Sequence, residues 1–319
     1  MHGDCLEVMS SITAHSVDLV LTDPPYGTMG GMGKSTGDFK RQTDAAKWDK
    51  VLSFAEMWQQ LDRIVRPNGV VILFAQEPFT TKLIMSANYA MPFCYRMAWH
   101  KNQFGNPLIA KIAPVNYYED ICVFTRKPAE MNMHHPLRDY FLSELVRSKF
   151  TKPQINKLLG NSMSSHYFTR GIQFVVPSAK DYAKLQATGF WPLPYAEIQS
   201  QHQQHKADFK QHYPRVFNLP EGKRHKSNIF TYPKDMPSLH PTQKPVALLA
   251  DLIQTYSRAG DTVLDFTMGS GSTGAACRQT GRQFVGIEKD DHYFEVAASR
   301  LKAASTMRPV NTGRLCIIP

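Results

Sequence analysis

The 319-residue chain has few cysteines, no long hydrophobic run and no recognisable export signal. Its five cysteines are scattered and odd in number, without the close pairs typical of zinc ligands. The lack of a disulfide framework favours a reducing, cytoplasmic compartment. No apolar stretch approaches membrane-spanning length, and the N-terminal residues lack the basic and then apolar segment of a secretory signal. We therefore expect a cytoplasmic protein without a membrane role.

Positive charge, in contrast, is abundant and concentrated in one segment. The formal net charge is +10, with 37 Lys and Arg against 27 Asp and Glu. Residues 147–226 alone carry thirteen basic and four acidic side chains, a net charge of +9. Such a cluster is typical of a surface that binds a polyanion. A solvated basic face without a partner would have the same composition.

An apolar, β-branched run at residues 17–22 predicts a buried strand, which two prolines then end. The next four residues, Asp23-Pro24-Pro25-Tyr26, place a carboxylate, a backbone kink without N–H donors and an aromatic ring at the carboxyl end of that strand. Ligands bind outside the carboxyl ends of strands in open α/β sheets, so chemistry is expected at this point. A Pro-Pro turn that merely ends a strand is the alternative interpretation.

This tetrapeptide resembles the catalytic motif of the amino-group DNA methyltransferases, in which Asp, Asn or Ser precedes Pro-Pro and an aromatic residue. The resemblance implies transfer of a methyl group from S-adenosylmethionine (SAM) to the exocyclic amine of a base. Asp23 and the Pro24 carbonyl would each accept one N–H, which allows direct, in-line transfer to the nitrogen. Tyr26 would stack on a base flipped out of the duplex. An aspartate in the first position favours N6 of adenine, with N4 of cytosine as the alternative.

Strand and helix patterns alternate in the first part of the chain. The glycine-rich loop over residues 27–37 would be either a flexible lid over the base pocket or a linker without that role. A helix is expected over residues 54–65, ended by Pro67-Asn68-Gly69. Strands are expected near residues 70–74, 93–99 and 120–125. This alternation predicts an α/β fold with a doubly wound, mostly parallel, Rossmann-like sheet.

Residues 131–236 are richer in Gln, His and Pro and lack long apolar strands. Thr151 is placed to cap a helix that ends at Gly160, and a short turn leads to another helix from Ser164. Two short helices joined by such a turn match a helix-turn-helix, whose second helix reads the major groove. A small helical bundle that only supports the insert is the alternative. Because of the basic charge we favour DNA contact, made by Ser165, His166, Thr169 and Arg170.

Two histidines in this segment, His202 and His205, have a spacing that metal ligands can show. No cysteine or paired carboxylate completes a site around them, so we expect no bound metal. Residues 201–205 are instead interpreted as a solvated linker.

The α/β pattern resumes after residue 236. The loop Gly269-Ser270-Gly271-Ser272-Thr273-Gly274 follows a predicted strand and opens a helix, and Glu288 ends the next strand. These glycines also spell the dinucleotide-binding pattern, so an NAD-dependent dehydrogenase is a rival hypothesis. That rival leaves the Asp-Pro-Pro-Tyr motif and the basic segment without a role.

The same region extends the resemblance to the methyltransferases. Their Asp-Pro-Phe-x-Gly-Ser-Gly loop is matched, except that Phe266-Thr267 stands where Pro-Phe is usual. The resemblance implies that Asp4 accepts a hydrogen bond from the cofactor adenine, that Glu288 binds the ribose, and that Thr242 and Lys244 hold the methionine carboxylate. The implied cofactor-binding residues are Asp4, Thr242, Lys244, Asp265, Phe266, Gly269, Ser270, Gly271 and Glu288.

The order of the motifs resembles the circularly permuted β-group of amino-methyltransferases, and residues 155–174 resemble phage and prophage adenine methyltransferases. We expect a catalytic half at residues 1–130, a basic, mainly helical target-recognition insert at 131–236, a SAM-binding half at 237–303 and a tail at 304–319.

The expected function is methylation of adenine in double-stranded DNA, either site-specific or with relaxed specificity, in a bacterial or phage-infected cell. A DNA-binding protein with an inactive cofactor site is the non-enzymatic alternative. A homodimer and a cognate restriction nuclease are compatible with the sequence, which decides neither. The recognition sequence is also undetermined, because it depends on which side chains reach base edges.

Overall fold

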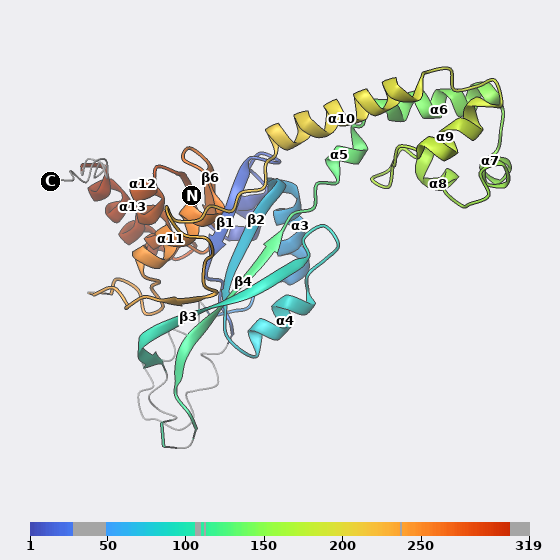
Figure 1. The fold of residues 1–319 in the computed structure, drawn as a ribbon. Coiled ribbons are helices and arrows are strands. Elements are labelled where there is room, and N and C mark those ends of the chain that lie inside the picture. Colours follow the sequence, from blue (N-terminus) through green and yellow to red (C-terminus); the bar gives the residue numbers. More distant parts are fainter. Residues whose placement is uncertain (28–48, 106–109, 112, 237, 307–319) are drawn as a thin grey trace. The chain divides into compact units, whose positions relative to one another are not determined.

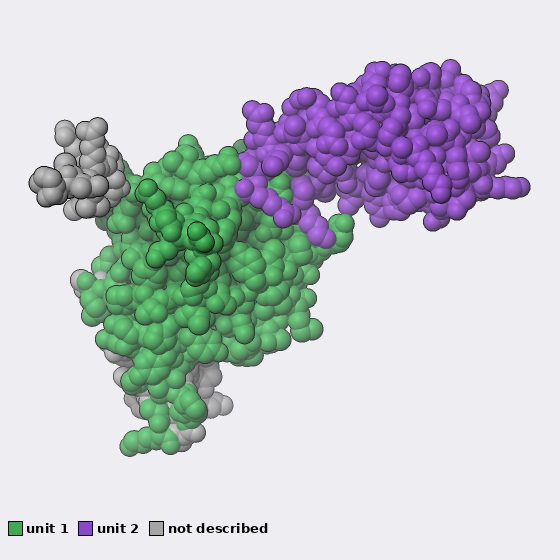
Figure 2. Space-filling model, in the orientation of Figure 1, with its two compact units in different colours: residues 1–126, 216–319 green, residues 127–215 purple. Residues whose placement is uncertain are grey.

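The computed structural model describes residues 1–27, 49–105, 110–111, 113–236 and 238–306 (Figure 1). The chain divides into two compact units: unit 1 comprises residues 1–126 and 216–319, and unit 2 comprises residues 127–215 (Figure 2). Most of the loop expected at residues 27–37, and most of the expected C-terminal tail, lie outside the described residues. The lid and linker interpretations of that loop therefore stay predictions.

Unit 1 is built on one seven-stranded sheet with the strand order β5-β3-β4-β2-β1-β6-β7. Strand β4 is antiparallel to both β2 and β3, and the other neighbouring strands are parallel. The prediction of a doubly wound, mostly parallel α/β sheet is confirmed. The strands are β1 (Val17–Thr22), β2 (Val65–Ala75), β3 (Phe93–Gly105), β4 (Asn116–Thr125), β5 (Ile229–Thr231), β6 (Thr262–Asp265) and β7 (Gln283–Gly286).

Helices cover both faces of this sheet because the central strands are apolar on both sides. In β1, Val20 belongs to one hydrophobic core, whereas Leu19 and Leu21 belong to the other. Side chains of α1, α3 and α4 complete the first core, and side chains of α11 and α12 complete the second. The helices in the described part of unit 1 are α1 (Cys5–Met9), α3 (Phe54–Ile64), α4 (Phe79–Met85), α11 (Val246–Tyr256), α12 (Ser272–Thr280) and α13 (Asp291–Thr306).

One predicted helix end is placed differently. Helix α3 ends at Ile64 and β2 begins at Val65, so Pro67-Asn68-Gly69 lies inside the strand and does not end the helix. The three residues form a bulge, because Val17 of β1 pairs with Val65 and Leu19 pairs with Val70. Asn68 takes the left-handed backbone conformation, with φ of 61°, that the bulge requires. Pro67-Asn68-Gly69 thus interrupts regular backbone structure as predicted, but it does so within β2 and not at the end of α3.

Unit 2 is helical throughout its regular structure in the described residues. Twelve basic and six acidic side chains fall within residues 127–215, so the unit is a basic, mainly helical insert, as expected. Eleven buried hydrophobic residues, among them Phe141, Tyr182 and Trp191, form a core that belongs to this unit. Its helices are α5 (Glu130–Met133), α6 (Leu137–Ser148), α7 (Lys152–Leu159), α8 (Ser164–Tyr167), α9 (Ala179–Gln186) and α10 (Tyr195–His212).

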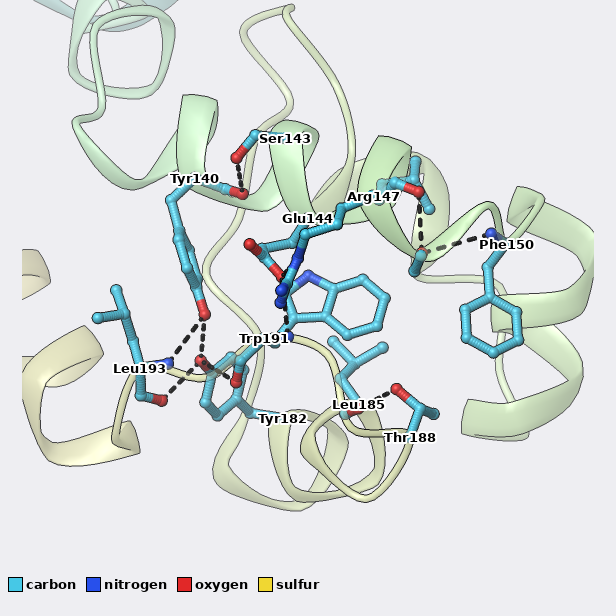
Figure 3. A network of polar contacts seen from close by, with 12 residues as sticks. Tyr140, Ser143, Glu144, Arg147, Phe150, Tyr182, Leu185, Thr188, Trp191 and Leu193 are labelled. Carbon is cyan, nitrogen blue, oxygen red and sulfur yellow. Dashed lines mark hydrogen bonds and ion pairs between the residues drawn. The ribbon is translucent and has the colours of Figure 1, made fainter.

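Several polar groups in and beside this core form hydrogen bonds, which lowers the cost of burying them. The hydroxyls of Tyr140 and Tyr182 lie 2.9 Å apart, and the Tyr182 hydroxyl donates to the Leu193 carbonyl at 2.8 Å (Figure 3). The Glu144 carboxylate accepts from the backbone N–H of Trp191 at 3.1 Å (Figure 3). The network thereby joins α6, α9 and the segment that leads into α10.

The predicted helix-turn-helix is corrected by the structure. Helix α7 forms as expected, with a capping box between Thr151 and Gln154 and a left-handed Gly160 at its end. The next helix, α8, ends after four residues, where the buried rings of Tyr167 and Phe168 enter the core of unit 2. One helical turn is too short to serve as a recognition helix in a major groove. The alternative, a small helical bundle, describes the local structure.

Two further expectations for the insert are corrected. The presumed linker at residues 201–205 is part of the 18-residue helix α10, and its histidines contact His135. Residues 216–236 belong to unit 1, where they supply the edge strand β5. Within the described part of the chain, no helix is both long and apolar enough to cross a membrane.

Candidate active site

The carboxyl ends of β1, β6 and β7 lie at the same edge of the sheet, because these strands are parallel neighbours. Asp23 follows β1, Asp265 ends β6 and Glu288 follows β7, so the three acids come to one edge. All three line a single cleft of about 1720 Å³ in unit 1. The topology therefore unites motifs that are more than 200 residues apart in the sequence.

Nearly all the residues predicted for catalysis and cofactor binding line this cleft. Gly271 is the exception: it caps the start of α12 with a left-handed φ of 74°. The residues proposed for DNA contact lie in unit 2, where Ser165 and Arg170 are exposed and His166 and Thr169 are half-buried. The predicted residues in the cleft are Asp4, Asp23, Pro24, Pro25, Tyr26, Thr242, Lys244, Asp265, Phe266, Gly269, Ser270 and Glu288.

The Asp23 carboxylate receives a protein donor on each oxygen. The Tyr26 hydroxyl donates to Oδ1 at 2.5 Å, and the Lys244 ammonium group donates to Oδ2. Burial and the nearby Asp23 charge raise the pKa of Tyr26 well above its ordinary value, so this hydroxyl stays protonated and remains a donor. The ring of Tyr26 also lies 5.1 Å from the ring of Phe79, which limits its motion.

Lys244, expected at the methionine carboxylate, lies between two acids. Its ammonium group bonds Asp23 and is 3.1 Å from Oε2 of Glu119, whose other oxygen is 2.5 Å from the ammonium group of Lys101. Lys244 is only 6% exposed and Lys101 only 5%, so the four charges alternate in a largely dry site.

Glu119 and Lys101 were not identified from the sequence. They lie on β4 and β3, near the end of β2, because Ala75 of β2 pairs with Asp120 of the antiparallel β4. No motif marks them. The sequence offers one indication of Glu119: it is a charged residue close to the apolar run of a central strand. A charged side chain that is buried in such a place needs a partner of opposite charge.

The charges of this group depend on one another. Burial raises the pKa of Asp23, and the positive charge of Lys244 opposes that increase. Burial also opposes ionisation of Glu119, but Lys244 and Lys101 together hold the pKa of Glu119 below its ordinary value. Burial disfavours the charged form of Lys244, yet the two carboxylates raise its pKa. Lys244 therefore stays charged at neutral pH.

Asp265 fixes the base of the glycine-rich loop. Its carboxylate is buried and accepts hydrogen bonds from the hydroxyls of Thr22 and Thr273, each at 2.6 Å. The backbone N–H of Thr267 donates to the same group at 3.2 Å. Burial raises the pKa of Asp265 to about 6 in spite of these hydrogen bonds. Asp265 thus connects β1, β6 and α12 beneath the cleft.

Thr267, at the point where this chain departs from the family loop, joins the two halves of the site. Its hydroxyl donates to the backbone carbonyl of Asp23 at 3.0 Å and lies 2.7 Å from the hydroxyl of Thr22. Its neighbour Phe266 is 1% exposed and belongs to the first hydrophobic core. The departure therefore adds a hydrogen bond between the glycine-rich loop and the Asp-Pro-Pro-Tyr motif.

The opposite end of the cleft is organised around Glu288. Its carboxylate accepts hydrogen bonds from the backbone N–H groups of Gly269 at 2.8 Å and of Lys289 and Asp290, each at 2.9 Å. Asp4 caps α1 through the N–H of Leu6, and Lys289 pairs with it at 2.9 Å. The hydrogen bond from Lys289 lowers the pKa of Asp4. Asp4 is thus held by the fold at the edge of the cleft.

These features fit an adenosine-containing cofactor. Gly269 has φ of 50°, and a side chain at this position would fill the space beside the ring of His240, 3.7 Å away. The glycine therefore lets a ligand approach the backbone closely. His240 and Tyr293, which were not among the predicted site residues, also line the cleft, with ring centroids 4.2 Å apart. Burial lowers the pKa of His240 to about 4, so that ring is neutral.

A doubly wound sheet with this glycine-rich loop and with Asp-Pro-Pro-Tyr at a neighbouring strand end defines a Rossmann-like methyltransferase. More specifically, the chain belongs to the DNA methylase family, whose model matches residues 17–299. It is therefore a SAM-dependent DNA methyltransferase, and the dehydrogenase alternative is set aside.

Individual relatives are distant but similar over nearly the whole chain. Type II methyltransferase M2.DpnII of Streptococcus pneumoniae is 24% identical over 314 residues, which cover 95% of this chain and 89% of that protein. Type II methyltransferase M2.LlaDCHI of Lactococcus lactis subsp. cremoris is 25% identical over 318 residues, with 96% and 90% covered. Among solved structures, PvuII DNA methyltransferase (cytosine-N4-specific) has a TM-score of 0.53 at 12% identity, covering 94% of this chain and 84% of that one, a likeness of fold alone.

Proposed function

We propose that the enzyme methylates the N6 amine of adenine in double-stranded DNA. The observation that carries this proposal is that Asp23-Pro24-Pro25-Tyr26, Gly269 and Glu288 line one cleft. A base amine and a methyl donor held in the same cleft react directly, without a covalent intermediate on the enzyme. The aspartate at the first position of the motif supports adenine. N4 of cytosine is the second candidate, since the PvuII enzyme of similar fold is cytosine-N4-specific.

The proposed mechanism rests on the positions of two acceptors. An exocyclic amine is a poor nucleophile because its lone pair is delocalised into the ring. With one N–H on the Asp23 carboxylate and the other on the Pro24 carbonyl, the lone pair turns toward the methyl group. SAM supplies that methyl group when bound. Tyr26 stacks on the flipped base, and its hydroxyl keeps the Asp23 carboxylate oriented.

The cofactor half is proposed to hold SAM by the residues that line its end of the cleft. Asp4 accepts from the adenine amine and Glu288 from the ribose hydroxyls. The backbone of Gly269 and Ser270 allows close approach, Gly271 turns the chain into α12 behind them, and Thr242 faces the methionine end. Asp265 and Phe266 support the loop from beneath, since the first is hydrogen-bonded inside the protein and the second is in the core.

Unit 2 is proposed to be the target-recognition domain. Its basic excess favours contact with phosphates, and Ser165, His166, Thr169 and Arg170 are the proposed contact residues. Without a recognition helix, these residues would act from α8 and the loop after it. Specificity for one site or relaxed specificity are both compatible with such a surface.

The biological setting is proposed from the motif order and the relatives. The order of the motifs supports the circularly permuted β-group, and residues 155–174 resemble phage and prophage adenine methyltransferases. The relatives are named Type II methyltransferases, which supports a role in restriction and modification with a cognate nuclease. We further propose a cytoplasmic location in a bacterial or phage-infected cell; a homodimer is compatible with this proposal but is not required by it.

Mass spectrometry of the product nucleosides tests the proposal. After incubation of the protein with SAM and unmethylated DNA, N6-methyladenine is expected. N4-methylcytosine would keep the mechanism and overturn the choice of base, and the absence of any methylated base would contradict the proposed function.

The variant Asp23→Ala tests the catalytic assignment. Methyl transfer should fall by roughly 1000-fold, because a preorganised acceptor for the amine is removed. SAM affinity should stay within about tenfold, since the acid contacts the base and not the cofactor. Single-turnover rates and calorimetric SAM binding measure the two effects. Substantial turnover by this variant would refute the role of Asp23.

A further inference from the structure

The ammonium group of the buried Lys244 contacts several protein groups in the cleft. The ammonium group of Lys244 donates to Asp23 and to the backbone carbonyl of Thr242, and it faces Glu119 at 3.1 Å. It also lies 5.1 Å from the centroid of the Phe74 ring. The ammonium group is thus surrounded by four protein groups, and its strongest contact is with the proposed catalytic acid.

We propose that Lys244 and Glu119 are a positioning pair for Asp23: Lys244 orients the carboxylate and keeps it ionised, and Glu119 holds Lys244 from the opposite side. This inference rests on the proposed function, in which Asp23 accepts an N–H of the target amine. A protonated carboxyl group is a weaker acceptor than a carboxylate, and a rotated one directs its lone pairs away from that N–H. Neither residue of the pair touches the reacting atoms.

The arrangement of charges supports this role. Burial alone would push Asp23 toward its neutral form, and an adjacent cation is the physical means of keeping a buried carboxylate charged. The cation is itself costly to bury unless it is paired. Glu119 is the second charged partner of Lys244, and the ammonium group of Lys101 lies 2.5 Å from the Glu119 carboxylate. The group of two carboxylates and two ammonium groups therefore has no net charge.

The orientation of Asp23 is defined by two donors from different parts of the fold. Tyr26 holds Oδ1 from the end of β1, and Lys244 holds Oδ2 from the segment before α11. A carboxylate has about four lone-pair positions, so acceptance of these two donors leaves positions for the amine. A side chain fixed in this way does not have to reorganise when the base arrives, which is the condition for electrostatic catalysis.

The pH dependence of single-turnover methylation tests this pair, because the two residues act on Asp23 with opposite signs. In Lys244→Met, the acidic limb of the profile should move to higher pH by about one unit or more, because the stabilising cation is lost. In Glu119→Gln, the acidic limb should move to lower pH, because a negative charge that opposes ionisation of Asp23 is removed. The other titratable groups that face the pair are Tyr26, Lys101, Lys234, His240 and Asp265. Burial and the charge of Lys244 both lower the pKa of His240, so loss of Lys244 raises that pKa too, whereas the shift expected for Glu119→Gln does not involve His240.

A matched control is Lys226→Met, which removes the lysine of another ion pair in unit 1, 2.5 Å from Asp251 and outside the cleft. It should leave the profile unchanged. Circular dichroism and calorimetric binding of SAM establish that each variant is folded. If Lys244→Met fails to fold, the shift expected for Glu119→Gln still tests the pair.

Two outcomes overturn the inference. If Lys244→Met loses SAM affinity by more than tenfold while its acidic limb stays in place, Lys244 acts on the cofactor. If both variants lose rate equally at every pH, the pair has only a structural role. Neither outcome affects the proposed function, which Asp23→Ala and the product analysis test separately.

Discussion

At the scale of single residues, the active site depends on short polar contacts between segments that are distant in the sequence. Thr267 is an example, since its hydroxyl reaches the Asp23 carbonyl 244 residues away. The family pattern has no hydroxyl at this position, so its role could not be read from the resemblance. In the structure, Thr267 provides a hydrogen bond between the glycine-rich loop and the Asp-Pro-Pro-Tyr motif.

We predict that Thr267→Val lowers the rate of methyl transfer about fivefold, because the Asp23 backbone loses a hydrogen bond worth ~1 kcal/mol and moves. SAM affinity should change less than the rate does. Thr267→Ser keeps the hydroxyl and should retain most of the activity. Single-turnover rates for the three proteins provide the comparison, and equal rates for valine and wild type would show that this contact is dispensable.

At the scale of secondary-structure elements, a histidine cluster ties the start of α6 to α10. His135 is 5% exposed, and its Nδ1 accepts the N–H of Leu137 at 3.2 Å. Its Nε2 therefore carries the proton and donates to Nδ1 of His202 at 2.8 Å, while His205 donates to the Met131 carbonyl at 2.8 Å. No group of residues suited to a metal ion occurs in the described part of the chain.

This cluster should make the stability of unit 2 depend on pH. Burial, with the neighbouring His205 and His202, lowers the pKa of His135 to about 4 in the folded protein. The unfolded chain, with an ordinary histidine pKa of about 6.5, therefore binds more protons between these values. The stabilisation is fully present above pH about 6.5 and is lost as the pH falls toward about 4.

Urea unfolding of the full chain between pH 4 and 7 checks this expectation. Hydrogen exchange of the unit 2 amides is the probe, because it reports the stability of that unit within the full chain. His135→Asn should reduce the slope of stability against pH in that interval. His212→Asn, at the exposed end of α10, is the matched control and should keep the slope. An identical slope for His135→Asn and wild type would contradict the role of the buried histidine.

At the scale of the whole molecule, each unit forms its hydrophobic core from its own residues. Among the described residues, the core of unit 2 draws only on residues between Leu137 and Ile198, and both cores of unit 1 draw only on residues outside 127–215. A domain of this length that buries its own aromatic residues can fold alone.

We predict that the fragment 127–215 folds cooperatively by itself. Within it, Phe141→Ala should cost about 3–5 kcal/mol, because a fully buried ring leaves a cavity. Val146→Ala, on the same helix but 79% exposed, should cost much less. Denaturant unfolding of the fragment and its two variants measures these differences, and a fragment without a cooperative transition would show that the unit needs the rest of the chain.

Much of the fold and of the candidate site followed from local patterns. Apolar runs such as residues 17–22 identified the central strands, because a strand buried on both faces has no polar alternation. Proline and glycine signals identified the Asp-Pro-Pro-Tyr turn and the loop at Gly269, because backbone restrictions are local. Thr151 and Gly160 marked the ends of α7 for the same reason.

What only the tertiary structure decided depends on contacts across long sequence separations. The pairing of Lys244 with Asp23 and Glu119 arises because sheet order places β4 beside β2 and the segment before α11 above them. The short length of α8 follows from where Tyr167 and Phe168 are buried. The sequence by itself determined the kind of fold and the chemistry of the motifs, since these are set by local backbone and side-chain preferences. The charge partners of the proposed catalytic acid were decided by folding, since no local pattern records which distant side chain will enter a buried site.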